Sequence, residues 1–381
     1  MMKAGARASL PGRDGQGRLA PSPPCPRGPS SFASRILLVT VLALLAACTS
    51  EETTPAPTAT ASAPTPATTP TATPPPTASP TASPAPSPTS EPDGEARTPP
   101  GEFGEPELVG AFDAEVVPGA SGLATSARNP GTRYLLDDRP GTGEVWVLRE
   151  DGSLRGAIAV EGLDALDTES LSVAACGPDD DRSCVYVGDV GDNLRTREDV
   201  RIYRFPEPDL ADGIPDAPVP ADVAVLTYPD APEDVEAMLV DDEGVPHLVS
   251  KAPFDAEEGV TGTTRLYKAE GFADGELREV AELDLPPPQQ PLLSIMVGDV
   301  VTGGAVDPDG RVLLRTYDHV LLGTPPQSDA PLASLPDWDF EEVPTPMLPQ
   351  AEAITWAADG CGYDLVSEHI GDVWHVPCLT E

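Results

Sequence analysis

Glu169-Ser170-Leu171-Ser172 is one of five short stretches of this chain that resemble one another, and each opens an apolar strand after a turn-rich segment. The other four are Ser121-Gly122-Leu123-Ala124, Glu236-Ala237-Met238-Leu239, Gly303-Gly304-Ala305-Val306 and Glu352-Ala353-Ile354-Thr355. Aligned on Gly122, Glu169, Glu236, Gly303 and Glu352, they are spaced 47, 67, 67 and 49 residues apart. A multi-strand unit that recurs at such a period is typical of a β-propeller. The sequence therefore predicts an all-β fold of five four-stranded blades.

Three more strands are predicted after each of the first four opening strands. Second strands are expected at 133–138, 184–190, 247–251, 311–318 and 363–369, third strands at 144–148, 201–205, 265–269, 320–323 and 372–376, and outer strands at 154–160, 223–228, 277–283 and 338–343. The fifth repeat has three strands only, and residues 108–112 are the candidate for its fourth. An N-terminal strand in the last blade would close the ring and leave no exposed sheet edge there. A sixth blade near 206–222 or 285–300 is the alternative, although both segments are rich in proline.

The N-terminal part of the chain reads as a signal for export. Arg35 precedes an apolar run, 36–47, that is too short to span a membrane and ends Leu45-Ala46-Ala47 before Cys48. The pattern resembles a bacterial lipoprotein signal, in which Cys48 becomes the lipidated N-terminus. A cleaved signal without a lipid, or an uncleaved anchor, is the alternative. We therefore expect residues 1–47 to be a signal peptide with a long n-region and the protein to lie on the outer face of the cytoplasmic membrane.

Residues 48–100 are predicted to be a disordered stalk rich in Thr, Pro and Ala. Residues 49–100 include 15 prolines and no aromatic residue, so they cannot bury a core. The folded domain is expected at 101–381, where 16 Lys and Arg face 57 Asp and Glu, a net charge of −41. Such a domain repels nucleic acid and anionic lipid, so we expect it to touch the membrane only through its lipid. We also expect a monomer whose partner is a small molecule or a component of the cell envelope.

Four of the six cysteines fall in the predicted propeller. Disulfides are expected in an exported domain, and three pairings are open. The predicted strand order favours Cys176–Cys184 and Cys361–Cys378, because each pair would staple one hairpin. A metal site is the weaker alternative, because no Cys-x2-Cys pair occurs.

The repeat also predicts a site. The start of a first strand and the end of a second strand lie at the same face of a propeller, beside the central channel. Glu169, Glu236 and Glu352 would converge there, and three carboxylates around a narrow channel do not all ionise readily without a cation. Oxygen ligands of this kind favour Ca²⁺. The alternative is that each glutamate caps neighbouring backbone amides.

Polar residues at the ends of the second strands supply further candidates. Ligand-binding residues are expected among Asp138, Asp189, Asp192, Asn193 and Glu368, and candidate catalytic residues are His319 and His369 for proton transfer and Lys251 and Arg315 for an anionic group. The run 188–193 could be a calcium loop or a plain Asx turn. Neither Gly-x-Ser-x-Gly nor His-Glu-x-x-His occurs in the sequence.

Four segments together resemble a family of exported bacterial β-propeller lipoproteins that is largely uncharacterised. They are 185–193, 201–208, 301–304 with 307–310, and 350–354. More loosely, the chain is similar to phytase-like and lactonase-like propellers, and that resemblance implies channel carboxylates that hold calcium. Two functions follow: a surface-anchored propeller that binds a ligand or partner at its channel face, or a calcium-assisted hydrolase of phosphate esters or lactones. We favour the first, because the sequence has no nucleophile motif and its charge repels anionic substrates.

Overall fold

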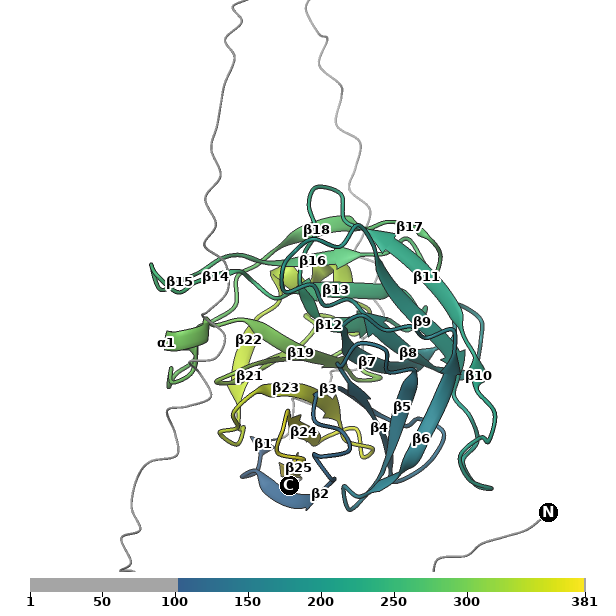
Figure 1. The fold of residues 1–381 in the computed structure, drawn as a ribbon. Coiled ribbons are helices and arrows are strands. Elements are labelled where there is room, and N and C mark those ends of the chain that lie inside the picture. Colours follow the sequence, from purple (N-terminus) through teal and green to yellow (C-terminus); the bar gives the residue numbers. More distant parts are fainter. Residues whose placement is uncertain (1–101, 380–381) are drawn as a thin grey trace, which may run out of the picture. The chain divides into compact units, whose positions relative to one another are not determined.

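The computed structural model describes residues 102–379. These residues form five consecutive antiparallel sheets that follow one another around a ring (Figure 1). Blade 1 contains β3 (Ala120–Thr125), β4 (Thr132–Asp137), β5 (Glu144–Arg149) and β6 (Leu154–Glu161), and blade 2 contains β7 (Thr168–Ala175), β8 (Ser183–Asp189), β9 (Val200–Pro206) and β11 (Asp222–Thr227). Blade 3 contains β12 (Val235–Val240), β13 (Pro246–Ser250), β16 (Thr264–Lys268) and β18 (Arg278–Leu283).

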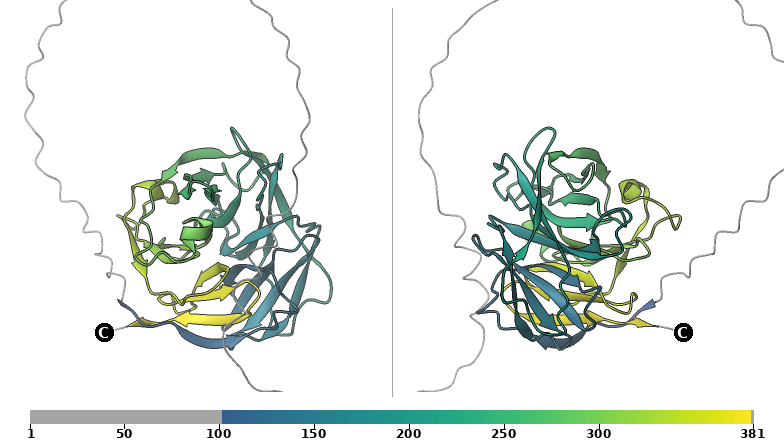
Figure 2. Two further views of the ribbon diagram at one scale, coloured as in Figure 1. Left: turned by 60° about the vertical axis from the view of Figure 1, so that its left-hand side comes forward. Right: turned by 90° about the vertical axis from the view of Figure 1, so that its right-hand side faces the viewer.

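Blade 4 contains β19 (Val301–Val306), β20 (Val312–Thr316), β21 (Val320–Gly323) and β22 (Phe340–Val343). Blade 5 contains β23 (Ala351–Trp356), β24 (Tyr363–Ser367) and β25 (Asp372–Val376), and its outer strand is β2 (Glu107–Ala111). The N-terminal strand β2 pairs antiparallel with β25, and Figure 2 shows it beside the C-terminal blade in both views. The predicted five-bladed propeller and its N-terminal closure are confirmed.

The segments considered for a sixth blade form none. Residues 206–222 carry the two-residue strand β10 (Val219–Pro220), which joins β6, and 285–300 carry the short helix α1 (Ser294–Val297). A second added strand, β17 (Gly275–Glu276), joins β11, and a small hairpin forms from β14 (Phe254–Asp255) and β15 (Val260–Thr261). The remaining elements are β1 (Glu102–Phe103), which pairs with β26 (Cys378–Leu379), and the 3₁₀ helix η1 (Leu332–Asp337). Strand β22 follows this helix and begins at Phe340, later than the predicted start at residue 338. No helix in the described residues is long and apolar enough to cross a membrane.

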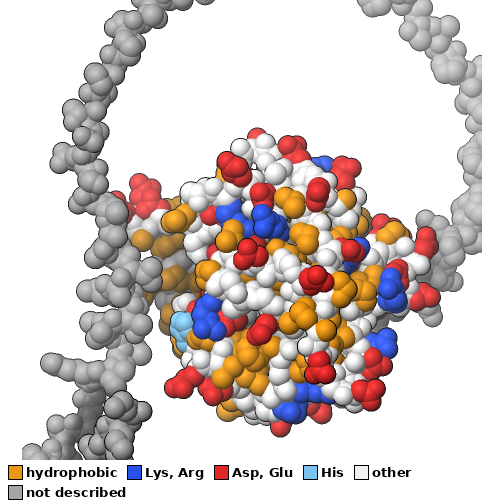
Figure 3. All heavy atoms as spheres, turned by 45° about the vertical axis from the view of Figure 1, so that its right-hand side comes forward, with side chains coloured by type: hydrophobic (Ala, Val, Ile, Leu, Met, Phe, Trp, Pro, Cys, Tyr) orange, Lys and Arg blue, Asp and Glu red, His pale blue; other side chains and the backbone are white. Residues whose placement is uncertain are grey.

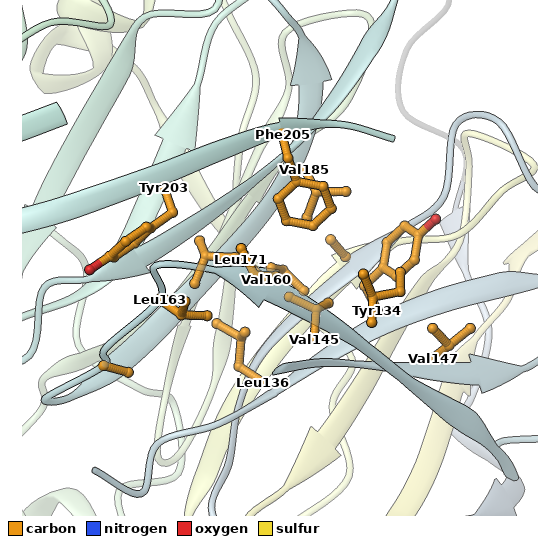
Figure 4. Packing of buried hydrophobic residues seen from close by; sticks show 14 of the residues in the cluster. Tyr134, Leu136, Val145, Val147, Val160, Leu163, Leu171, Val185, Tyr203 and Phe205 are labelled. Carbon is orange, nitrogen blue, oxygen red and sulfur yellow. The ribbon is translucent and has the colours of Figure 1, made fainter. Parts of the chain in front are cut away.

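The apolar core lies between adjacent blades. Tyr134 and Val145 of blade 1 pack against Leu171, Val185 and Phe205 of blade 2 in one such cluster (Figure 4). Equivalent clusters fill the other four junctions. Because each blade buries both faces against its neighbours, the ring holds its inner strands in fixed mutual positions.

Both predicted disulfides are present in the structure. Cys176 bonds Cys184 across the β7–β8 hairpin, and Cys361, before β24, bonds Cys378 after β25. The acidic side chains are spread over the face seen in Figure 3, interspersed with apolar ones and a smaller number of Lys and Arg. That distribution is typical of solvated loops and does not single out one site.

Candidate functional site

Each channel glutamate sits on a β-bulge of its innermost strand. In β7 the register shifts between Thr168 and Ser170, which leaves Glu169 without a partner on β8, and the same shift isolates Glu236 in β12 and Glu352 in β23. A bulge re-aims the side chain it carries. All three glutamates are less than 9 % exposed and line a single cavity with space for only about 10 Å³. The structure therefore brings the three predicted carboxylates together.

The other two blades place hydroxyls at this register. The bulge in β19 falls at Thr302, and in β3 at Ser121-Gly122, so Thr302 and Ser121 correspond to the glutamates. The predicted alignment on Gly303 and Gly122 is one residue late in these blades. Ser121 Oγ donates to the carbonyl of Thr168, 2.6 Å away, and Thr302 Oγ1 donates to that of Ala351 at 2.6 Å. Each hydroxyl thus fixes the residue that precedes a glutamate in the next blade.

Lys251 enters the channel cluster from the end of β13. Its Nζ donates to Glu236 Oε1 and lies 3.3 Å from the Tyr317 hydroxyl. Among the described side chains, the second oxygen of Glu236, Oε2, is buried without a hydrogen-bond partner. The structure therefore places Lys251 in an ion pair with a carboxylate that was predicted to bind metal.

Arg315 is buried in β20 and is 1 % exposed. Its Nη1 lies 3.5 Å from the carbonyl oxygen of Ala353 in β23, the residue after Glu352. Burial lowers the pKa of Arg315 to about 9, while the nearby charge of Glu352 opposes that shift. Because it is covered by protein, this guanidinium neutralises the channel and does not present itself to a ligand.

The channel electrostatics follow from burial and crowding. Burial and then the charges of Glu236, Asp167 and Glu352 raise the pKa of Glu169 well above its usual range. Burial likewise raises the pKa of Glu352, with Glu236 adding to the rise, and raises the pKa of Glu236 to about 7 against the effect of Lys251. Burial alone would lower the pKa of Lys251, but the Glu236 carboxylate raises it well above its usual value. The ammonium therefore stays charged, and the three glutamates bind protons at a higher pH than glutamates in water do.

The donors of the channel do not fit a metal ion well. In residues 102–379 no group of three or more His, Cys, Asp or Glu side chains is arranged to hold one. Ca²⁺ takes six to eight oxygen ligands, and one glutamate here is already bound to an ammonium. Calcium binding by Glu169, Glu236 and Glu352 stays a prediction.

Asp138, Glu368 and His369 lie at the channel mouth. Burial and then Glu368 raise the pKa of Asp138 to about 6. His369 is exposed, with Nδ1 2.7 Å from the carbonyl of Pro118 and Nε2 3.2 Å from Glu368. Its ring is thus held at the rim of blade 5.

The loop after β8 is held by a largely buried ion pair between Asp189 and Arg197. The Asp189 carboxylate accepts from the backbone N–H groups of Leu166 and Asp167 and from both terminal nitrogens of Arg197, at 2.9–3.1 Å. Asp192 accepts from the Arg197 backbone N–H at 2.7 Å, and Asn193 is exposed. These contacts give Asp189 and Asp192 a role in holding the turn.

His319 lies elsewhere, in a pocket between blades 3 and 4 that we call the interblade pocket. It has a volume of about 520 Å³ and opens on the channel face, because it is lined by the start of β16, the end of β18, Asp299 in the segment that leads into β19, and the β20–β21 turn. His319 is 1 % exposed, with Nδ1 3.1 Å from Thr316 Oγ1 and 3.7 Å from Asp299 Oδ1. Its Nε2 and Asp299 Oδ1 have no hydrogen-bond partner among the described residues.

Sequence reasoning missed most of this pocket. Asp299 was not singled out, although it stands two residues before the first strand of blade 4, and burial raises the pKa of its carboxyl. The run Thr261-Gly262-Thr263-Thr264 supplies hydroxyls, and an unusual density of threonine in one loop was the available signal.

Comparison with known proteins gives distant likenesses only. No family model and no curated protein matches this chain. Among solved structures, a gluconolactonase from Xanthomonas campestris is 13% identical with a TM-score of 0.37, covering 74% of this chain and 97% of its own. A PQQ-bound aldose sugar dehydrogenase from Streptomyces coelicolor is 11% identical with a TM-score of 0.41, and the match covers 73% of this chain and 99% of the dehydrogenase. Virginiamycin B lyase from Staphylococcus aureus is 12% identical with a TM-score of 0.34, covering 74% and 90%. At these values the likenesses do not bear on function, and the strand order itself identifies the chain as a five-bladed β-propeller.

Proposed function

We propose that this chain is an extracytoplasmic binding propeller that takes a small organic cation into the interblade pocket. In this proposal Cys48 carries a lipid and residues 48–100 hold the propeller away from the membrane. The observation that carries the proposal is the pocket itself, with about 520 Å³ on the channel face. Ligand sites in proteins usually enclose about 300–1,000 Å³. The channel cavity, with about 10 Å³, has no room for an organic ligand.

The lining of the pocket favours a positively charged ligand. Its charged side chains are Glu282, Asp284 and Asp299, and neither Lys nor Arg is among the described residues that line it. Arg265 Nη2 lies 3.8 Å from Glu282 and so compensates one carboxylate in part. An ammonium or guanidinium group would be attracted here, whereas a phosphate ester would be repelled.

Threonine hydroxyls and two leucines complete the wall. Thr261, Thr263 and Thr316 provide donors and acceptors, while Leu283 and Leu285 provide apolar contact. A few polar groups set in a partly apolar wall are typical of a site that orients a small molecule. We therefore expect a compact amine with at least one hydroxyl or carbonyl group.

The calcium-assisted hydrolase is the second candidate, favoured by one observation: His319 and Asp299 line the pocket as an imidazole and a carboxylate 3.7 Å apart. That pair could move a proton. The other groups that hydrolysis would use are not with them, because Lys251 is paired with Glu236 and Arg315 is buried in β20 outside the pocket lining. Binding without hydrolysis accordingly explains more of the site.

The test is a ligand titration of the full chain carrying Cys48→Ser. Choline and ethanolamine, two compact cations that each carry a hydroxyl group, are compared with glucose and inorganic phosphate by calorimetry. We expect binding of one or more cations and none of phosphate. Asp299→Asn should weaken that binding about tenfold, since a charged hydrogen bond contributes about 1.5–3 kcal/mol.

Asp216→Asn is the matched control, because it removes the same charge from an exposed loop outside the pocket. It should leave the affinity unchanged. Binding of phosphate or glucose in preference to the cations, or equal effects of the two substitutions, would contradict the proposal. Turnover of a lactone or phosphate ester that depends on calcium would favour the second candidate.

A further inference from the structure

We infer that Lys251 is the resident cation of the channel, standing where a propeller with converging carboxylates would otherwise need a metal ion, and that removing Lys251 turns the channel into a divalent-cation site. This inference concerns the channel cluster and is independent of the interblade pocket.

The backbone of Lys251 is fixed from two sides. Its N–H donates to the carbonyl of Asp234 at 2.8 Å, and its carbonyl accepts from Arg195 Nη2 at 2.7 Å. The side chain is 17 % exposed, and its Nζ reaches Glu236 Oε1 while lying 5.6 Å from the centre of the Tyr317 ring. Bonds at both ends hold the ammonium in one place, as a bound ion would be held.

The charge of Lys251 reaches all three glutamates. It opposes the rise in pKa of Glu169 and Glu352 as well as that of Glu236. The three carboxylates line one cavity with space for only about 10 Å³. The ammonium of Lys251 lies beside this cavity, bonded to Glu236, and it compensates the crowded carboxylates as a point charge with three donors that needs no shell of six ligands.

The unpartnered Oε2 of Glu236 shows that the channel cluster lacks a donor for one of its carboxylate oxygens. This oxygen is buried in a side chain that is 3 % exposed, yet no described group donates to it. Three carboxylates, Lys251 and Arg315 together carry a net charge of about −1 when all are ionised. Without Lys251 the net charge is about −2, which a divalent cation would balance, and the space left by the side chain would admit it.

The experiment compares the full chain carrying Cys48→Ser with the same chain carrying Lys251→Met. Thermal melts are recorded in EDTA and in calcium chloride. The parent should melt at the same temperature in both. Lys251→Met should melt lower in EDTA and recover about 5 °C at calcium a hundredfold above its Kd. Terbium(III), excited through Tyr317, should become luminescent with Lys251→Met and stay dark with the parent.

Lys268→Met is the matched control, since Lys268 ends β16 at the opposite face and carries the same charge. It should respond to neither metal. Two results would overturn the inference: calcium stabilising the parent as much as Lys251→Met, or a folded Lys251→Met that ignores both calcium and terbium.

A second variant covers the case in which Lys251→Met fails to fold. Lys251→Met with Glu236→Gln removes the ion pair from both sides and should regain at least half of the lost melting temperature, without a calcium response. If the double variant also fails to fold, or melts no higher than a folded Lys251→Met, Lys251 acts through packing against Tyr317, and the inference is wrong.

Discussion

At the scale of single residues, the buried charges of this protein are held by specific neighbours. Glu207 is an example outside the channel. Its carboxylate accepts from Ser126 Oγ, from the Tyr134 hydroxyl at 3.0 Å, from Ser183 Oγ at 2.6 Å and from the Arg128 backbone N–H at 3.1 Å. The four donors come from blades 1 and 2, so one carboxylate links two blades at the face away from the channel mouth.

Replacing Glu207 should therefore be costly. Glu207→Ala leaves buried hydroxyls without an acceptor, and we expect a loss of about 3 kcal/mol in the free energy of unfolding. Glu207→Gln keeps part of the network and should lose less. Urea melts measure the difference, with Glu198→Ala at an exposed position as control. Equal effects of Glu207→Ala and Glu198→Ala would show that the network adds nothing to stability.

At the scale of elements, stability depends on how closely adjacent inner strands approach. Gly303 in β19 faces β23 so closely that a Cβ atom built there would stand 2.2 Å from the carbonyl oxygen of Glu352. At the next residue, Gly304, the nearest atom would be a flexible leucine methyl at 3.1 Å. The glycine at 303 thus sets the distance between blades 4 and 5, and with it the position of Glu352.

The two neighbouring glycines provide a matched pair. Gly303→Ala should destabilise the propeller by about 2–3 kcal/mol, because backbone must move to admit the methyl group. Gly304→Ala should cost clearly less, since a side chain can give way. Thermal melts of the two variants decide the matter, and a larger loss for Gly304→Ala would contradict the assigned approach of the blades.

Closure of the ring is the second prediction at this scale. β2 pairs with β25 from Glu107↔His375 to Ala111↔Asp372. Deleting residues 102–112 removes this strand and leaves β25 as an open edge, so the product should aggregate or lose several kcal/mol. Deletion of residues 49–100 should leave the melting temperature unchanged. If both truncations melt alike, β2 does not close the ring in solution.

At the scale of the whole molecule, the excess negative charge and the buried carboxylates both make the folded protein less stable as the pH rises. Burial raises the pKa of Glu236 to about 7 and that of Asp138 to about 6. A carboxyl whose pKa is raised by folding binds its proton more tightly in the folded state, so stability increases as the pH falls through that value. Burial lowers the pKa of His247 to about 4, which has the opposite effect once the pH falls below its unfolded value of 6.5.

We therefore expect the melting temperature to rise as the pH is lowered from about 8.5 to about 6.5, before His247 begins to oppose the trend. Protonation also lowers the net negative charge of the protein, and the weaker repulsion among its carboxylates adds to this rise. Glu236→Gln separates the two causes, because it removes a channel carboxyl and should flatten the slope. Calorimetry at several pH values measures it. A melting temperature that falls over this range would refute the raised carboxyl pKa values.

Attachment to the membrane is a prediction for the whole chain, and Cys48 lies outside the described residues. Cys48→Ser should move the protein from the membrane fraction to the medium or leave it unprocessed, since the thiol that would carry the lipid is lost. Fractionation and the intact mass give the answer. An unchanged fraction and mass would rule out lipidation at Cys48.

Much of the fold could be predicted because it depends on local patterns. Five repeats of alternating apolar residues with turn signals indicated the blades, a missing fourth strand indicated the closure by residues 108–112, and hairpin spacing indicated both disulfides. The alignment slipped by one residue at Gly122 and Gly303, because a bulge in each inner strand shifts the register and leaves no mark in the apolar pattern.

The sequence by itself determined the five-bladed ring and the convergence of Glu169, Glu236 and Glu352, since a strand period and a repeat length depend only on residues near one another in the chain. The tertiary structure alone decided how those charges are compensated. Lys251 and Glu236 are 15 residues apart, and their contact arises only when β12 and β13 pair. The interblade pocket likewise forms from two blades whose spacing is set by the packing of their shared core. Long-range contacts of this kind carry no periodic signature, and in this protein they determine which groups remain free to meet a ligand.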